Sequence, residues 1–293
     1  EPGDIVMVEA PAYPAAIQTL RLAGASIVEI PMDTQGMQTD VLADLLGSLP
    51  PGQSAKLLYT VPTFSNPRGT TLSDERRLAL CRLARQHGFI VVEDDPYGEL
   101  SFSAAKPQTV YAMSEKEDSR GNPVVYLSSL SKTVAPALRI GWMVGPAEIV
   151  RRCAIAKQTT DMCTSPFTQM VAAEYLRSGR YATNVSLASE EYACRMNAMA
   201  DQLEAALAVH MRFDRPEGGM FLWVECQHDL DTRRLFNAAV DNGVLFVPGS
   251  AFFASQAGSQ CMRLSFASPR VGDIRSGIDR LTQAVQSCIS KTI

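Results

Sequence analysis

The sequence predicts an α/β fold in which a mainly parallel sheet with helices on both faces is followed by a smaller α/β unit. In the first half, short apolar segments rich in β-branched residues alternate with helical segments. Such segments are typical of strands buried on both faces of a sheet, and the alternation is typical of crossover helices. Long helical segments dominate from about Glu148 onward. The 293 residues, 46% of them hydrophobic, suffice for the core of one or two domains.

The first half contains six expected strands and one especially clear helix. Ser73 is a suitable N-cap for a helix over Asp74–His87, because its hydroxyl can accept a hydrogen bond from the first turn. Acidic residues in that turn suit the positive end of the helix dipole, and Gly88 is a typical C-terminal stop. The six strands are expected at Ile5–Val8, Ser26–Ile30, Lys56–Thr60, Phe89–Val92, Val124–Leu127 and Ile140–Val144.

The second half is expected to form the smaller unit, which has antiparallel character. The boundary is placed near Gly179, giving a large domain over 1–179 and a small C-terminal domain over 180–293. The polar segment Ser114–Asn122 is expected to be a surface loop. Helices are expected at Glu148–Thr160, Ser165–Ser178, Tyr181–Ala208, Thr232–Asn242 and Val271–Ser287. Strands are expected at Met220–Val224, Val244–Val247 and Cys261–Phe266, with a turn at Pro248–Gly249. Candidate inner positions of the longest helix are Leu187, Tyr192, Met196, Met199, Leu203 and Leu207.

Composition and charge argue against several classes of protein. Lys and Arg number 27 against 31 Asp and Glu, and this net charge of −4 argues against nucleic-acid binding. No apolar run is long enough for a transmembrane helix, so no membrane partner is expected. Seven scattered cysteines without a CxxC pair favour a reducing cytoplasm over disulfides. The three histidines lack metal-ligand spacing, so no metal site is expected, and the GxSxG hydrolase motif is absent.

Polar clusters follow three of the expected strands. The first contains Asn66, the second contains Asp94 and Tyr97, and the third contains Ser129 and Lys132. Ligands of open α/β sheets bind at the carboxyl ends of the strands, and these ends meet at one edge of the sheet. The three clusters are therefore expected to lie together at a ligand site.

Each cluster alone has an ordinary structural explanation. Asn-Pro-x-Gly is most often a turn, paired acids after a strand often cap a helix, and a serine-rich stretch with one lysine is most often a solvated loop. Asp95, next to Asp94, is a second candidate for any role given to an acid. A P-loop at Ser131-Lys132-Thr133 is rejected, because no GxxxxG segment precedes the lysine. The three clusters become specific for a function only when they are taken together, in this order along the chain.

Taken together, the motifs resemble those of the fold-type I pyridoxal-phosphate aminotransferases of class I/II. The most similar subgroup holds the 2-aminoadipate and kynurenine aminotransferases and the aminotransferase-like domains of GntR-type regulators. The resemblance runs over the whole chain, and the block around Lys132 is the most diagnostic. Its motifs are Pro11-Ala12-Tyr13-Pro14, Asn66-Pro67-x-Gly69, Glu93-Asp94-Asp95-Pro96-Tyr97-Gly98, Ser129-Leu130-Ser131-Lys132, Arg139-Ile140-Gly141-Trp142, Pro216-x-Gly218-Gly219-Met220-Phe221-x-Trp223, Val247-Pro248-Gly249 and Met262-Arg263-Leu264-Ser265-Phe266.

The resemblance implies a role for each residue that would face the cofactor ring. Lys132 matches the lysine whose amine forms a Schiff base with the aldehyde of pyridoxal 5′-phosphate and later moves a proton. Asp94 matches the carboxylate that keeps the pyridine nitrogen protonated. Tyr97 and Asn66 match the groups that hydrogen-bond the 3′ oxygen, and Tyr13 matches the aromatic side chain that stacks on the ring.

The phosphate and the substrate have matching residues as well. Ser129, Ser131 and Arg139 match the phosphate-binding groups, since two hydroxyls and a guanidinium suit a dianion. Arg263 matches the arginine that binds the substrate α-carboxylate as a bidentate fork, and Asn66 is expected to assist it. The implied reaction moves an amino group between an L-amino acid and a 2-oxo acid. In this family the site lies between two subunits, so a homodimer is implied.

The resemblance is incomplete at the start of the chain, and Arg68 departs from it. The N-terminal elements of the family, including a Gly-Ser-Gln-type phosphate loop, have no counterpart here, so the large domain is expected to lack its first elements. Arg68 replaces the usual Thr and either adds charge near the site or faces water. Three alternatives stay open: a ligand-sensing domain of a GntR-type regulator, another pyridoxal-phosphate reaction such as β-elimination or decarboxylation, and an inactive fragment.

Overall fold

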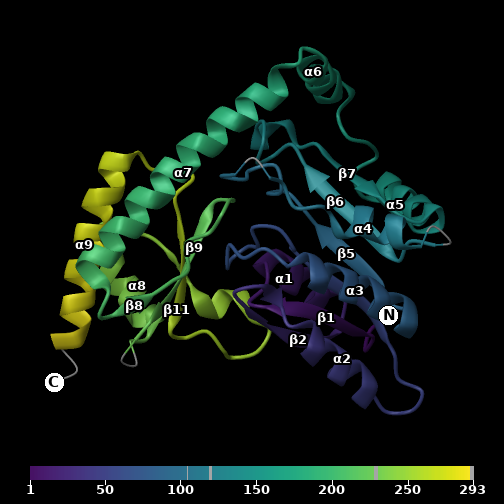
Figure 1. Ribbon diagram of the computed structural model, residues 1–293, viewed down its shortest axis with the longest axis horizontal. Coiled ribbons are helices and arrows are strands. Elements are labelled where there is room, and N and C mark those ends of the chain that lie inside the picture. Colours follow the sequence, from purple (N-terminus) through teal and green to yellow (C-terminus); the bar gives the residue numbers. More distant parts are fainter. Residues whose placement is uncertain (104, 119–120, 228–229, 291–293) are drawn as a thin grey trace.

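The computed structural model describes residues 1–103, 105–118, 121–227 and 230–290, which form two sheets with flanking helices (Figure 1). The larger sheet has seven strands in the order β3-β2-β1-β4-β5-β6-β7. The smaller has four antiparallel strands in the order β10-β11-β9-β8. The predicted α/β fold is confirmed. No helix within the described ranges is long and apolar enough to cross a bilayer.

Five central strands of the large sheet are parallel, as predicted. Both edge strands, β3 (Gly36–Met37) and β7 (Gly141–Val144), run antiparallel to their neighbours. The parallel strands are β1 (Ile5–Ala10), β2 (Ser26–Asp33), β4 (Ala55–Thr60), β5 (Ile90–Asp94) and β6 (Val124–Ser129).

Helices cover both faces of this sheet because successive strand residues point to opposite sides. On one face, Met7, Leu58 and Val91 pack in a common core against α2 (Thr39–Ser48), α3 (Asp74–His87) and α4 (Val110–Glu117). On the other face, Val8 and Tyr59 pack against α1 (Pro14–Leu22) and Phe221 of the small sheet. The helix predicted at Asp74–His87 is confirmed: the Ser73 hydroxyl accepts from the Arg76 amide, and Gly88 ends the helix with a φ of 70°.

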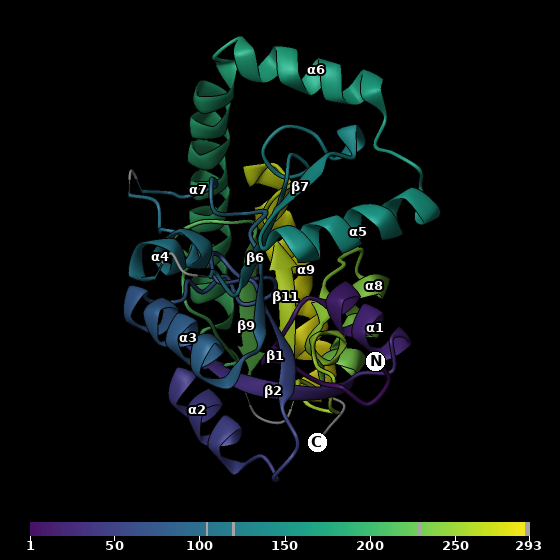
Figure 2. The same ribbon diagram turned by 90° about the vertical axis from the view of Figure 1, so that its right-hand side faces the viewer.

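Three helices connect the two sheets. They are α5 (Ala147–Thr160), α6 (Pro166–Arg177) and the 28-residue α7 (Arg180–Leu207). Figure 2 shows α6 bridging from α5 to the far end of α7. The small sheet consists of β8 (Met211–Arg212), β9 (Phe221–Cys226), β10 (Val247–Pro248) and β11 (Cys261–Ser265). Its core face packs against α7, α8 (Thr232–Asp241) and α9 (Val271–Ser290).

Three local predictions were wrong. The segment Val244–Val247 is not a strand: only Val247 and Pro248 pair with β11, and Leu245 is 76% exposed. Leu187 is 59% exposed, because the buried positions of α7 begin with Val185 and Ser189, which leave Leu187 on another face.

The segment Ser114–Asn122 is not simply a surface loop. Its first four residues complete α4, which runs to Glu117, and Ser114 is fully buried. The physical reason is Arg85, whose Nη2 donates to the Ser114 hydroxyl over 2.7 Å. Residues 119 and 120 lie outside the described ranges.

Arg77 of α3 is the largest fully buried side chain of the described residues. Its Nη1 lies 3.8 Å from Oε1 of Glu93, which is also fully buried and accepts hydrogen bonds from the first amides of α4. Burial raises the pKa of Glu93 to about 7, and the nearby guanidinium opposes that rise. The other acceptors from Arg77 are Leu72 O, Pro62 O and Thr63 Oγ1 at 2.8 Å and Gln108 O at 3.0 Å.

Replacing Arg77 by Met is expected to lower the free energy of unfolding by about 3–5 kcal/mol, because the buried oxygens and Glu93 lose their partner. Chemical denaturation at pH 7 measures the change. The control is Arg82→Met on the same helix, where an exposed ion pair with Glu117 contributes less than about 1 kcal/mol. Equal losses for the two variants would contradict the central role of Arg77.

Candidate active site

The site lies where the strand order of the large sheet reverses. From β1 the chain crosses to β2 on one side, and β4 then pairs with β1 on the other side. Such a switch point leaves a crevice at the carboxyl ends of the strands. Tyr13 follows β1, Asn66 follows β4 and Asp94 ends β5, so this edge carries all three predicted residues.

Asp94 is held by a tyrosine that sequence reasoning missed. Its Oδ2 accepts a hydrogen bond from the Tyr59 hydroxyl over 2.6 Å. Burial raises the pKa of Asp94, and the hydrogen bond from Tyr59 lowers it. In the register of β4 and β5, Tyr59 lies opposite Val92, so its side chain shares a face with Asp94 two residues later. This pairing is invisible in the sequence until the strand register is known.

Asp95 has a different environment, which separates it from Asp94. Its carboxylate accepts from the Gly98 amide at 2.9 Å and from the Tyr126 hydroxyl at 3.4 Å. Burial raises its pKa to about 6. A Cβ on Gly98 would lie 2.6 Å from this carboxylate, so glycine is needed for the turn. Asp95 therefore stabilises the turn that carries Tyr97.

Asn66 and Arg263 connect the large and small sheets directly. Arg263 on β11 donates from Nη1 to Oδ1 of Asn66 over 2.7 Å. Its guanidinium carbon lies 4.1 Å from the ring centre of Phe221 and 5.1 Å from that of Phe252. These rings orient the arginine through cation–π contacts, and burial lowers its pKa.

Tyr97 and Tyr13 complete this group. Tyr97 is buried, and burial followed by the charge of Asp94 raises the pKa of its phenol. Arg263 and a hydrogen bond with Asn66 oppose that rise. Tyr13 is 39% exposed and lies close enough to act electrostatically on Tyr97 and Arg263. The structure thus brings together five of the nine predicted residues: Tyr13, Asn66, Asp94, Tyr97 and Arg263.

The other four predicted residues, Ser129, Ser131, Lys132 and Arg139, occupy the connection after β6. The Ser129 hydroxyl donates to Ile140 O and accepts from the Ser131 amide, which closes the turn. Ser128, which was not predicted to have a role, donates to Asp95 O over 2.7 Å and so connects this turn to the residue that follows β5. Within the described ranges, no hydrogen bond joins these four residues to Asn66 or Arg263.

Lys132 and Arg139 are the two cations of this connection. Lys132 is half-buried. Arg139 is exposed, has a φ of 53° and donates to Pro136 O over 3.2 Å. It also borders a hollow of about 440 Å³, which is lined in addition by the ion pair of Lys157 and Asp161.

The donor set fits pyridoxal phosphate and a substrate carboxylate. Nε of Arg263 is buried and has no partner among the residues that the structure describes, so it retains a hydrogen bond for an anion. Asp94 accepts only from Tyr59 within the same residues, so its second oxygen can accept a pyridinium N–H. Buried donors and acceptors of this kind are costly without partners.

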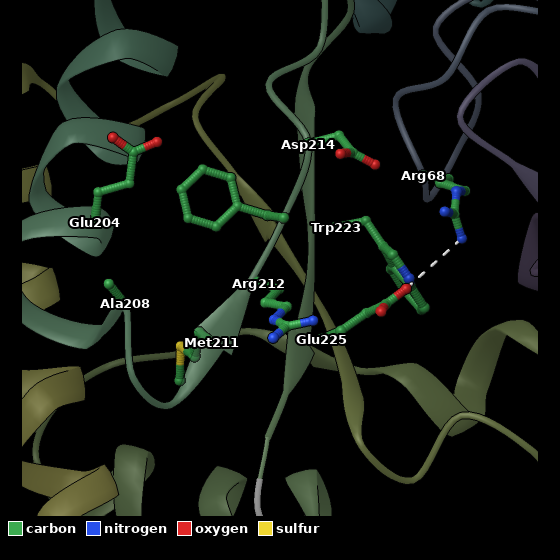
Figure 3. A pocket seen from close by; sticks show the side chains of 9 residues that line it. Arg68, Glu204, Ala208, Met211, Arg212, Asp214, Trp223 and Glu225 are labelled. Atoms are coloured by element: carbon green, nitrogen blue, oxygen red, sulfur yellow. Dashed lines mark ion pairs between the residues drawn. The ribbon is translucent and has the colours of Figure 1, made fainter.

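A separate hollow of about 390 Å³ is lined by Met211 and Arg212 of β8 and by Trp223 and Glu225 of β9, among others (Figure 3). None of the nine predicted residues lines it. Arg68 does, and its Nη1 lies 3.7 Å from Oε1 of Glu225. Arg68 therefore neither faces water nor enters the group around Asn66, but connects its loop to β9.

No group of three or more His, Cys, Asp and Glu residues could hold a metal ion within the described ranges. His228, one of the three histidines, lies outside those ranges.

Comparisons with known proteins converge on one family. The sequence model described as "Aminotransferase class I and II" matches residues 1–281. The aromatic-amino-acid aminotransferase 1 of Thermococcus litoralis is 39% identical over 291 residues, which are 99% of this chain and 69% of that protein. The crystal structure of the Pyrococcus horikoshii kynurenine aminotransferase, in complex with PMP, has a TM-score of 0.92. It is 41% identical, with 98% of this chain and 70% of that chain covered.

A regulator is also similar. An uncharacterized HTH-type transcriptional regulator of Bacillus subtilis, YisV, is 33% identical over 274 residues, covering 94% of this chain and 54% of the regulator.

Glu9 is a further buried carboxylate, and it lies next to the end of β4. Glu9 of β1 accepts hydrogen bonds from Thr60 Oγ1 at 2.5 Å and from the Val61 amide at 3.0 Å. Burial nevertheless raises its pKa from an ordinary 4.5 to about 7. Since the folded chain favours the protonated form, the ionised form of Glu9 destabilises the fold.

The stability contribution of Glu9 is therefore expected to be complete below pH 4.5 and to fall as the pH rises to about 7. Relative to Glu9→Gln, the natural chain should lose about 3 kcal/mol of unfolding free energy between pH 4.5 and 8. Denaturant titrations at several pH values measure this, with the exposed Glu75→Gln as control. A pH-independent difference for Glu9→Gln would disprove the assignment.

Proposed function

The chain belongs to the class I and II aminotransferases, and from this premise we propose that Lys132, Asp94 and Arg263 are the groups that carry its reaction. The enzyme uses pyridoxal 5′-phosphate to move an amino group from an amino acid to a 2-oxo acid. The observation that supports the proposal is the Arg263–Asn66 hydrogen bond, because it joins a guanidinium, a group suited to binding carboxylates, to the group that contains Asp94 and Tyr97.

Arg263 orients the substrate. Its planar guanidinium can bind the α-carboxylate through two parallel hydrogen bonds, and the rings of Phe221 and Phe252 hold it in place. Asn66, already bonded to Nη1, assists at the same anion. A carboxylate fixed in this way leaves the Cα–H bond of the substrate in one orientation relative to the amine of Lys132.

Asp94 and Lys132 are proposed to control two protons, one on the ring nitrogen of the cofactor and one on the substrate Cα. When bound, pyridoxal phosphate supplies an electron-withdrawing pyridinium ring that stabilises negative charge at the substrate Cα. The Asp94 carboxylate would hold a proton on the ring nitrogen, and Lys132 Nζ would remove the proton from the substrate Cα. Tyr97 and Asn66 would hydrogen-bond the 3′ oxygen of the cofactor, and the Tyr13 ring would pack against the cofactor ring and limit access of water.

Ser129, Ser131 and Arg139 are proposed to bind the phosphate. The Ser129 hydroxyl also closes its turn, so its contribution includes holding Ser131 in place. Arg139 contributes a charged donor at the edge of its hollow. The large domain over 1–179 would thus bind the cofactor, and the small domain over 180–293 would contribute Arg263.

We also propose a cytoplasmic homodimer acting on an amino acid with a large aromatic side chain. Similarity to the Thermococcus litoralis enzyme supports the substrate class. Phe167 and Met170 on α6 are 73% and 71% exposed, and α5 buries none of its side chains, which supports a covering partner. The free cysteines support a reducing compartment.

Lys132→Ala is expected to abolish fixation of the cofactor by borohydride, because the reacting amine is removed. The measurement is the absorbance spectrum of the protein with pyridoxal phosphate, before and after reduction, followed by peptide mapping. Lys157→Ala, which removes an exposed lysine paired with Asp161, should fix the cofactor normally. Fixation on another lysine in the Lys132 variant would refute the proposal.

Arg263→Ala is expected to raise the KM for the amino acid about 10²-fold, because a buried charge-assisted fork is lost. Steady-state kinetics measures KM, and a competitive inhibitor lacking the α-carboxylate supplies the control. Its inhibition constant should stay the same, since it does not use Arg263. If both constants change equally, Arg263 supports the structure and does not recognise the carboxylate.

A further inference from the structure

Tyr59 contacts Asp94 and has no role in the proposed cofactor chemistry. It belongs to β4, is almost fully buried and packs with Val8, Val61 and Phe64. A buried tyrosine hydroxyl requires a hydrogen-bond partner, and here the partner is Oδ2 of Asp94 at 2.6 Å. This is the short distance expected when a hydroxyl donates to a carboxylate.

The direction of this hydrogen bond is fixed. Burial, followed by the charge of Asp94, raises the pKa of Tyr59 well above its ordinary value, so the phenol keeps its proton at every working pH. Tyr59 can therefore only donate to an ionised Asp94. Because a donor favours the charged form of its acceptor, it opposes the burial that would otherwise protonate Asp94.

We propose that Tyr59 is a positioning residue for catalysis, which keeps the Asp94 carboxylate ionised and fixes its rotamer so that the second oxygen is available to the cofactor ring. This inference rests on the proposed role of Asp94. Within the described ranges no other side chain donates to Asp94, so the effect of Tyr59 has no substitute.

The adjacent pair Tyr126 and Asp95 provides a matched control. Tyr126 on β6 also places its hydroxyl on a buried carboxylate, at 3.4 Å from Asp95 Oδ2. Tyr59 and Tyr126 thus lie on the two strands that flank β5, and each contacts one of two consecutive acids. Tyr126→Phe likewise removes a tyrosine hydroxyl, here one with a longer contact, from the acid that stabilises the turn.

The first experiment compares Tyr59→Phe and Tyr126→Phe without and with cofactor. The Asp94 carboxyl is titrated in the cofactor-free protein by carbon-13 NMR, and the dissociation constant of pyridoxal phosphate is measured by fluorescence. Tyr59→Phe should raise the pKa of Asp94, weaken cofactor binding about tenfold and move the acidic limb of the kcat/KM profile to higher pH. Tyr126→Phe should leave all three unchanged. An unshifted Asp94 titration in Tyr59→Phe overturns the inference.

A double-mutant cycle separates this inference from the role of Asp94 itself. If Asp94 serves the ring nitrogen, Asp94→Asn alone should reduce kcat strongly, and adding Tyr59→Phe should reduce it no further. Near-normal turnover in Asp94→Asn would defeat the proposed role of Asp94. A strong loss in Asp94→Asn with fully additive loss from Tyr59→Phe would defeat only the positioning role.

A fluorinated tyrosine keeps the test decisive if Tyr59→Phe does not fold. Incorporating 3-fluorotyrosine at position 59 retains the ring and hydroxyl but makes the phenol a stronger donor. The acidic limb of the kcat/KM profile should then move to lower pH, opposite to Tyr59→Phe. An unchanged limb with this substitution would overturn the inference.

Discussion

The geometry of the site depends on the buried guanidinium of Arg77. A charge of this kind remains in an apolar core only where its donors are satisfied, and here they bind oxygens from separate segments. Two acceptors, Pro62 O and Thr63 Oγ1, precede Asn66 in the loop after β4. Glu93, the ionic partner, immediately precedes Asp94 on β5. Arg77 therefore fixes the backbone next to Asn66 and Asp94, two side chains of the proposed site.

The opposite side of the same loop is held by the small sheet. Asn66 accepts from Arg263, and Arg68 lies against Glu225, so two contacts join this loop to neighbouring strands β11 and β9. Gly69 has a φ of 73°, and a Cβ there would lie 3.0 Å from Pro216 and 3.1 Å from the Phe221 carbonyl. The loop after β4 is thus held by Arg77 on one side and by the small sheet on the other. These contacts place Asn66 between the sheet that carries Asp94 and the sheet that carries Arg263.

The sequence predicted the central strands and the edge of the sheet where the site lies, because apolar β-branched segments and their order are local signals. It also named five residues that the fold brings together, although their roles stay predictions. It could not reveal Tyr59, since the contact with Asp94 follows from the register of β4 against β5. The strand predicted at Val244–Val247 failed for a similar reason: an apolar segment becomes a strand only where a partner is available, and β11 pairs only with its last residue and Pro248.

Strand periodicity gives different partners to three consecutive acids, Glu93, Asp94 and Asp95. On β5, Glu93 points to the face of α3 and α4, where Arg77 and the first amides of α4 bind it. Asp94 points to the opposite face, toward Tyr59, where no described cation lies within ion-pair distance. Asp95 follows the strand and accepts a hydrogen bond from the Gly98 amide, which stabilises the turn. Pairing Asp94 with an arginine would keep it ionised more strongly, but it would also neutralise the charge that the proposed role of Asp94 at the ring nitrogen requires. A neutral phenol favours the ionised carboxylate while preserving its negative charge, so a tyrosine at position 59 suits the role proposed for Asp94.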